Sequence, residues 1–268
     1  MSLPLRTVAV TVSVAAISAT LACTPKSDKP AADSAAPSSS ASASASASTS
    51  GLAPSDLGPV EPIPPGTDVA AVIERGIKTP PYSGKADVHT ELADKTAVTM
   101  TGRVNLNTAL SGTIRLTITP GAPTEQVIDQ VITGTHVYIK QGAGAWTKRT
   151  HAEMGAGQLP NLSLSKYAQA LVKQGAATVN GMETKDGVQT YRLSGKVTLD
   201  QVKAIEPRLH DQLRAQGLDG FQCAVWVDQQ GRVVRMEQWL KISGKDGHNT
   251  FALSGFGPTF AAKPPAGV

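Results

Sequence analysis

Apolar and polar residues alternate along much of the chain between residues 82 and 258, and this spacing is typical of β-strands that bury one face. The clearest cases are two neighbouring segments whose apolar residues fall on one side of each strand: Val98, Met100, Val104 and Leu106 in the first, and Ile114, Leu116 and Ile118 in the second. Residues that favour turns separate the segments at short intervals. The pattern therefore predicts an antiparallel sheet with one buried face.

Further along, the chain predicts a hairpin and then three more strands. Asp186 and Gly187 stand between two alternating segments, and this dipeptide is a strong signal for a two-residue turn, so we expect a hairpin over residues 180–197. The last strands are expected at 221–228, 232–242 and 248–256, and the predicted inward residues of the first two are Phe221, Cys223, Val225, Val227, Val234, Met236, Leu240 and Ile242. Trp226 and Trp239 are expected on the outward face, where they would mark a contact surface.

Three segments show the 3.6-residue spacing of amphipathic helices. The first covers residues 68–77 with Thr67 as its expected N-cap, and the second covers 164–172. In the third, 198–217, Pro207 is expected to break or kink the helix, and His210 is expected on the solvated side. With roughly nine strands, these helices predict an α+β domain whose long antiparallel sheet curls around two or three helices on one face.

The first 22 residues have the composition of an export signal. Arg6 is their only charged side chain, and the apolar run that follows is too short and too rich in small polar residues for a transmembrane helix, which needs about 20 apolar residues. Residues 20–23, TLAC, resemble the bacterial lipobox, although Thr20 stands where that motif usually has leucine. The resemblance implies cleavage between Ala22 and Cys23 and a diacylglycerol thioether on Cys23. The alternative is an ordinary signal with an incidental cysteine.

Residues 23–65 are rich in serine, alanine and proline and contain no aromatic residue, so they cannot bury enough apolar surface to fold. We expect a lipidated cysteine followed by a disordered tether that holds the domain away from a membrane. The remaining residues, 66–268, suffice for one domain with a substantial core.

The sequence contains no motif that indicates catalysis or metal binding. The five histidines lack the spacing of a metal site, and no G-x-S-x-G motif occurs. A net charge of +4, dispersed lysines and arginines and few aromatic residues give little support for nucleic-acid binding. With Cys23 lipidated, Cys223 has no disulfide partner and is expected in the core. We therefore expect a monomer without enzyme activity, cofactor or metal.

Four segments resemble, in the same order, stretches of the LppX/LprG/LprF-type lipoproteins of actinobacteria: THVYIKQGAGAWTKR, NGMETKDGVQTYRLSGKV, AVWVDQQGRVVRMEQW and LSGFGPTFAAKPP. The resemblance implies a LolA/LolB-like half-barrel, which is a strongly curved antiparallel sheet whose concave face, closed by helices, forms an apolar cavity. It also implies that this cavity binds acylated lipids or glycolipids, which better-known members are implicated in moving outward from the plasma membrane.

The inward apolar residues are the candidate site, and we expect these to line the cavity: Met100, Val104, Leu116, Ile118, Val225, Met236 and Leu240. For each of them the alternative is packing against the helices. The leading hypothesis is a lipoprotein on the outer face of the bacterial plasma membrane that binds acylated lipids or glycolipids, and its extension is that the protein also transfers them. The second hypothesis is a sensor or scaffold with a filled core that binds a protein partner.

Overall fold

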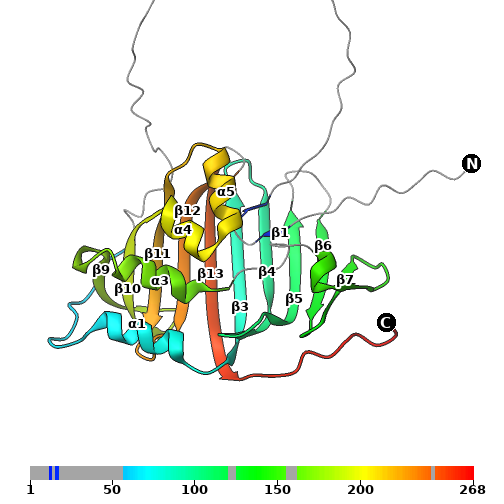
Figure 1. Cartoon of the computed structure of the whole chain (residues 1–268), viewed down its shortest axis with the longest axis horizontal. Helices are drawn as coiled ribbons and strands as arrows, with labels where there is room; N and C mark the ends of the chain where they lie inside the picture. The colour runs from blue at the N-terminus through cyan, green and yellow to red at the C-terminus, as the bar shows by residue number, and fades with distance from the viewer. Residues whose placement is uncertain (1–11, 14–15, 18–56, 120–124, 155–161, 243–244) are drawn as a thin grey trace, which may run out of the picture.

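Eleven strands form one antiparallel sheet, and helices pack on one of its faces (Figure 1). The computed structural model describes these residues: 12–13, 16–17, 57–119, 125–154, 162–242 and 245–268. Cys23 and most of the expected tether lie outside them. The described part confirms the expected fold class, a strongly curved and unclosed antiparallel sheet with helices on its inner face.

The sheet has two arms that meet at the pairing of its first and last strands. The first arm contains β3 (Tyr82–Leu92), β4 (Ala97–Leu106), β5 (Ser111–Thr119), β6 (Gln126–Ile132), β7 (His136–Gln141) and β8 (Thr147–Thr150). The second contains β9 (Val179–Lys185), β10 (Val188–Thr198), β11 (Gly220–Asp228), β12 (Val233–Ile242) and β13 (Lys245–Pro258). The spatial order is β8-β7-β6-β5-β4-β3-β13-β12-β11-β10-β9, so β8 and β9 are the free edges.

Two short strands precede this sheet and take no part in it. They are β1 (Val12–Ser13) and β2 (Ala16–Ile17), which pair with each other. All eleven strands of the large sheet and all described helices therefore lie after residue 56.

Turn chemistry places the hairpin between β9 and β10 where the sequence predicted it. Asp186 and Gly187 both have positive φ, 50° and 77°, which a two-residue type I′ turn requires. Strand pairing on either side begins at once, with Lys185 opposite Val188. The sheet has eleven strands, which exceeds the roughly nine expected, and each of its edge strands β8 and β9 pairs with one neighbouring strand.

A β-bulge reverses the predicted side of Val234. The pairing of β11 with β12 shifts after Trp226, so that Val227 lies opposite Val233. One extra residue in a strand moves the following side chain to the other face. Val233 consequently joins the inner cluster, whereas Val234 packs on the outer face with Trp226.

The main helices occur where the 3.6-residue spacing predicted them. They are α1 (Val69–Lys78), α3 (Leu164–Val172), α4 (Leu199–Ile205) and α5 (Pro207–Ala215), with an unpredicted short helix α2 (His151–Met154) and a 3₁₀ turn (Ala176–Thr178). Pro207 occupies the first turn of α5, so the predicted break is confirmed. The predicted cap of α1 is wrong, because Asp68 and not Thr67 accepts the hydrogen bond from the backbone N–H of Ala71, at 3.0 Å.

The predicted solvated position of His210 is also wrong. Its exposed fraction is 8%, and its neighbours Leu209 and Leu213 are buried as well. Positions 209, 210 and 213 span about 100° around a helix, which is the usual width of a core-facing stripe. Cys223 lies in the core as expected, and burial raises the pKa of its thiol.

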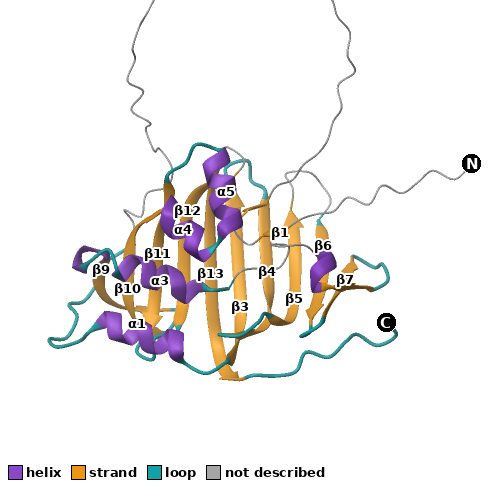
Figure 2. Cartoon of the chain, in the orientation of Figure 1, coloured by secondary structure: helices purple, strands orange, loops and turns teal. Residues whose placement is uncertain are grey.

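Helices cover mainly the second arm of the sheet (Figure 2). Helix α3 packs on β10, β11 and β12, and α4 packs on β10. On the first arm, α2 packs on β7 and β8. The second arm is thus a two-layer core of sheet and helices, and this asymmetry positions the candidate site.

Candidate functional site

One row of apolar side chains crosses nine strands on the inner face. Cross-strand pairing connects, in order, Val179, Leu193, Val225, Met236, Phe251, Val88, Met100, Leu116 and Ile128. Directly paired side chains lie close enough to pack against each other. The row forms a continuous apolar band from the edge strand β9 to β6.

The seven candidate residues all belong to the cluster that contains this row. Four of them lie in the row itself, namely Met100, Leu116, Val225 and Met236, and the other three, Val104, Ile118 and Leu240, lie in neighbouring rows of the same face. Each is at most 9% exposed. The structure therefore brings the predicted residues together, and their role as a lipid-contacting surface stays a prediction.

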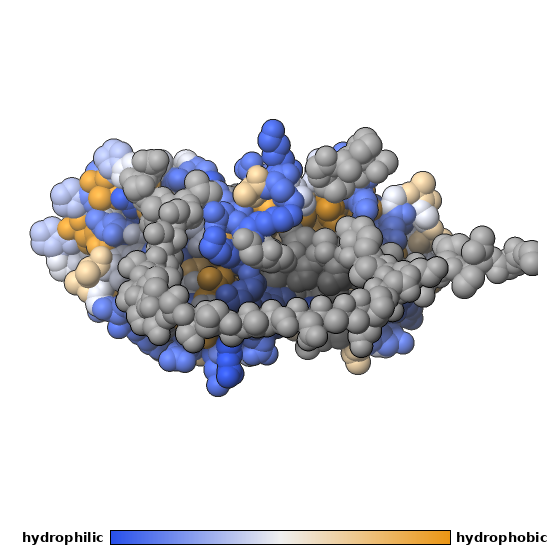
Figure 3. Space-filling view, turned by 90° about the horizontal axis from the view of Figure 1, so that it is seen from above, coloured by the Kyte–Doolittle hydropathy of each residue, from blue (hydrophilic) through white to orange (hydrophobic). Residues whose placement is uncertain are grey.

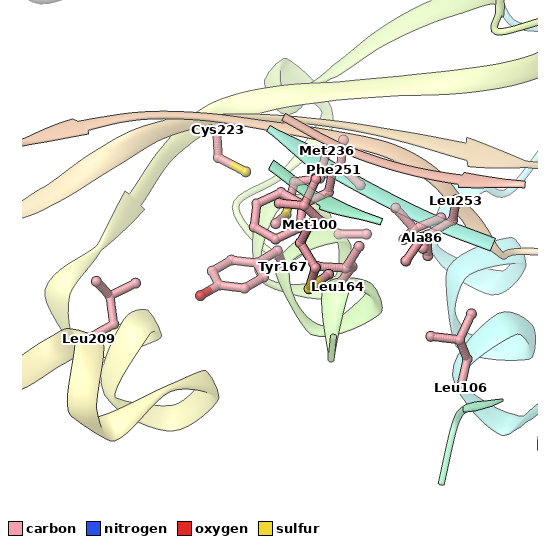
Figure 4. Packing of buried hydrophobic residues seen from close by; sticks show 14 of the residues in the cluster. Ala86, Met100, Leu106, Leu164, Tyr167, Leu209, Cys223, Met236, Phe251 and Leu253 are labelled. Carbon is pink, nitrogen blue, oxygen red and sulfur yellow. The ribbon is translucent and has the colours of Figure 1, made fainter. Parts of the chain in front are cut away.

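The part of the row beneath α3, which reaches from β11 to Met100 of β4, is used for packing. Leu164 and Tyr167 of α3 lie against Met100, Met236 and Phe251 (Figure 4). The rings of Tyr167 and Phe221 are 6.1 Å apart, a distance at which aromatic pairs attract. Residues on β11 and β12 thus have their main partners in α3.

The inner face of β5 and β6 has a different surrounding. Its side chains are Ile114, Leu116, Ile118, Ile128, Gln130 and Ile132. All six are buried, and Gln130 is the polar residue among them. None of the main helix packing contacts of the described residues involves these two strands. This arm is the better candidate for a surface that contacts a ligand.

A polar network crosses the inner face beneath α3. The Nδ2 of Asn249 donates to the Oε1 of Gln238 at 3.3 Å, and Tyr167 donates to the carboxylate of Glu206 at 2.8 Å. Burial, followed by the nearby Glu206 carboxylate, raises the pKa of Tyr167 well above its ordinary value. A neutral tyrosine is a hydrogen-bond donor here, so the network ties α3 to the junction of α4 and α5.

The prediction that Trp226 marks an exposed contact surface is wrong. Trp226 points outward, but it is fully buried among Leu57, Ala224 and Val234. Its indole N–H donates to Glu183, and the ammonium of Lys185 lies 4.4 Å from its ring centroid. The covering segment begins before the expected start of the domain, at residue 57.

Residues 57–61 are fastened to the outer face by backbone contacts. The guanidinium of Arg192 donates to the carbonyl oxygens of Leu57 at 2.6 Å and Gly58 at 3.0 Å. Glu61 and Met182 exchange two backbone hydrogen bonds of 2.7 and 2.8 Å, which extend the sheet past β9. We call residues 57–61 the strap.

A charged network lies next to the strap on β12 and β13. Glu237 accepts hydrogen bonds from Arg235 at 2.6 Å and from His248 at 3.2 Å. Burial alone would raise the pKa of Glu237, but these two bonds outweigh it and lower the pKa to about 2. Trp239 is partly buried and stacks on His248, with 5.0 Å between ring centroids.

Seen from above, the described surface is largely hydrophilic, with hydrophobic residues in separate patches (Figure 3). Among the described residues, the exposed large apolar side chains are Val188 and Val268. That same part of the chain has no cluster of three or more metal-ligating side chains, and none of its helices has the length and apolar character needed to span a bilayer.

Sequence reasoning missed several members of the inner band. Val88, Leu193, Phe251 and Ile128 were not among the candidates, although each stands in an alternating segment. Cross-strand pairing is what aligns them with Met100 and Met236, and register between strands cannot be read from one strand alone. Gln130 stands at an inward position of the segment QVIDQVI, which is a visible signal that sequence reasoning passed over.

A family model matches the sequence, and the fold resembles that of a solved structure. The model of the LppX_LprAFG lipoprotein family matches residues 88–259, which is more than half of the chain. The crystal structure of LprF from Mycobacterium bovis has a TM-score of 0.53 at 17% identity, and the match covers 74% of this chain and 97% of that one. For the lipoprotein LppX of Mycobacterium tuberculosis the TM-score is 0.45 at 15% identity, with 73% and 98% covered. No curated protein matches the chain.

Proposed function

Because the chain belongs to the LppX_LprAFG lipoprotein family, we propose that its inner sheet face binds the acyl chains of lipids or glycolipids. The observation that supports this most is the apolar band, which continues from the helix-covered arm onto β5 and β6. An acyl chain that leaves a bilayer for this surface would keep its apolar area away from water, at about 25 cal/mol per Å². Transfer between membrane and protein would then be nearly balanced in free energy.

We further propose that Cys23 carries the membrane anchor. The export-signal pattern and the TLAC motif before it support this part of the proposal, and Cys23 lies outside the described residues. One acyl chain holds a protein only marginally on a bilayer, whereas two or more hold it stably. The domain would then sit on the outer face of the plasma membrane, close to its lipid source.

Native mass spectrometry tests lipid binding. The chain from residue 23, carrying Cys23→Ser, contains the whole eleven-stranded sheet and its helices. After gentle purification from an actinobacterial host it should show added masses of acylated lipids that organic extraction removes. A single mass equal to the polypeptide alone, from several hosts and preparations, would contradict the proposal. The sensor or scaffold hypothesis, with its filled core, predicts this second result.

Peptide mass spectrometry tests the anchor separately. In the full-length protein from membranes, the first peptide should begin at Cys23 and carry a diacylglyceryl group. Cys23→Ser should remove that group and shift protein from the membrane fraction to the soluble fraction. A Cys23 peptide without lipid, in protein that is still membrane-bound, would contradict this assignment without affecting lipid binding by the domain.

A further inference from the structure

Gln130 is a polar side chain in the middle of an apolar surface. It lies on the inner face of β6 between Ile128 and Ile132 along the strand, and opposite Ile114 and Ile139 on the neighbouring strands. Its exposed fraction is 7%. Isoleucines therefore flank it on all four sides, although a residue in this position would ordinarily be apolar as well.

The carboxamide oxygen of Gln130 has no hydrogen-bond partner among the described residues. A buried acceptor without a partner lowers stability, so its presence in a folded protein calls for an explanation, of which a bound group that donates to it is one. Asn249 offers a contrast on the same face: its Oδ1 also lacks a partner, but its amide nitrogen donates to Gln238 within a polar network. The residues that flank Gln130 are isoleucines, which provide no such polar network.

The surroundings of Gln130 limit what can donate to it. A cation would lose its hydration in this apolar setting without a counter-charge nearby. A buried water needs two to four polar partners, and the four flanking isoleucines provide no polar side-chain atom. A hydroxyl group on a molecule that is otherwise apolar satisfies the acceptor and leaves the isoleucines in contact with hydrocarbon.

We propose that Gln130 accepts a hydrogen bond from a free hydroxyl group of the bound lipid, and so selects lipids in which a hydroxyl stands next to the acyl chains. Partially acylated glycerols and glycolipids have this chemistry, whereas fully esterified glycerols lack it. The inference rests on the proposed function, since it names the lipid class for the same surface.

Competition between two matched lipids tests this selection. The chain from residue 23 carrying Cys23→Ser is incubated with phosphatidylcholine vesicles that contain equal amounts of dioleoylglycerol and of the same lipid with its hydroxyl acetylated. The protein is then separated from the vesicles, and its lipids are quantified by mass spectrometry. We expect dioleoylglycerol to be enriched about five- to tenfold, in line with one hydrogen bond to a buried acceptor.

Gln130→Leu should bring this ratio close to one while the total lipid bound is retained. Gln126→Leu is the matched control, because Gln126 lies on the same face of β6 but is exposed, and it should keep the enrichment. Gln130→Met is a second variant of similar volume, for the case that leucine disturbs folding. Both replacements at residue 130 should raise the melting temperature of the lipid-free protein.

The outcomes separate the two proposals. If wild-type protein takes up both lipids equally, or if Gln130→Leu keeps the enrichment, the role of Gln130 is overturned and lipid binding stands. If no protein takes up either lipid, the proposed function itself is contradicted and this inference falls with it.

Discussion

The two arms of the sheet carry the same alternation of apolar and polar residues but have different surroundings. On β11 and β12, Val225 and Met236 pair with each other and lie beneath α3. On β5 and β6, Leu116 and Ile128 continue the same band without a main helix contact among the described residues. The outer faces differ too, because the strap covers the second arm at Trp226.

This difference shows that one sequence pattern can serve two purposes. The alternation of apolar and polar residues predicts which side chains are buried, and the prediction holds in both arms. What those side chains then contact depends on helices and loops from elsewhere in the chain. We infer that the second arm is a packed scaffold. On the proposed function, the ligand contacts the first arm, whose inner side chains are buried as well.

The largest effect is expected from shortening a side chain beneath α3. Met236→Ala should lower the free energy of unfolding by about 2–5 kcal/mol, because it leaves a cavity in a packed core. Leu116→Ala on the other arm should lower the free energy of unfolding by about half as much, because none of the main helix contacts of the described residues involves this strand and fewer contacts are lost. Urea denaturation of both variants measures the difference. Equal losses would mean that the two arms are equally packed, and the comparison would fail.

The strap should be the next most sensitive part of the scaffold. Arg192→Met removes the donor to two backbone carbonyls of the strap and leaves Glu183 without its cation. We expect the free energy of unfolding to fall by about 2–3 kcal/mol, because the strap carbonyls and the charged Glu183 carboxylate that lose their partner are largely buried. Limited proteolysis should then cut near residue 57 sooner than in the wild-type protein.

Arg115→Met is the control for this prediction. Arg115 forms an ion pair with Asp129 on the outer face of the first arm, at 2.7 Å, but its side chain is 62% exposed. Exposed ion pairs contribute little to stability, so Arg115→Met should lower the free energy of unfolding far less than Arg192→Met does. A cost as large as that of Arg192→Met would show that the outer faces of the two arms do not differ in the way proposed.

A pH effect of intermediate size is expected from Glu237, again on the scaffold arm. Its pKa falls from 4.5 to about 2 in the folded protein, beside Arg235, His248 and Lys185. A lowered pKa stabilises the fold above the unfolded value and loses that contribution as the pH drops from about 5 towards 2. After allowance for solvent screening, we expect ionised Glu237 to contribute about 1–2 kcal/mol to the free energy of unfolding.

Glu237→Gln isolates this contribution from other carboxyl groups. The difference in unfolding free energy between wild type and variant should be present at pH 5 and shrink as the pH falls from 5 to 2. Equilibrium denaturation at several pH values measures it. A difference that stays constant over the whole range would show that Glu237 is not held by its cationic neighbours.

Local patterns predicted the fold well, and contacts between distant residues account for what they missed. The positions of strands, the turn at Asp186 and the break at Pro207 depend on neighbours in the chain, so the sequence shows them directly. The side of Val234 depends on a bulge, which alternation cannot reveal. Arg192 and Leu57 are 135 residues apart, and nothing near either residue indicates their contact.

The candidate site was predictable only in part for the same reason. The inward side of Met100 and Leu116 follows from alternation within their own strands. Whether a helix lies above them depends on the path of α3, which strand sequences do not encode. Gln130 shows both sides of this limit: its inward position can be read from the segment, but its missing hydrogen-bond partner can be recognised only in the structure.

The smallest effect on stability is expected from enlarging a side chain on the ligand-facing arm, and this change separates the arms most clearly. On the proposed function, lipid and not a helix lies next to Leu116, so Leu116→Trp should lower the free energy of unfolding by less than about 1 kcal/mol. It should nevertheless reduce co-purified lipid several-fold, measured by native mass spectrometry. Val225→Trp places the same ring beneath α3 and should cost about 1–3 kcal/mol from overpacking. If Leu116→Trp instead destabilises the protein as much as Val225→Trp does, the first arm is a filled core, and lipid must bind elsewhere or not at all.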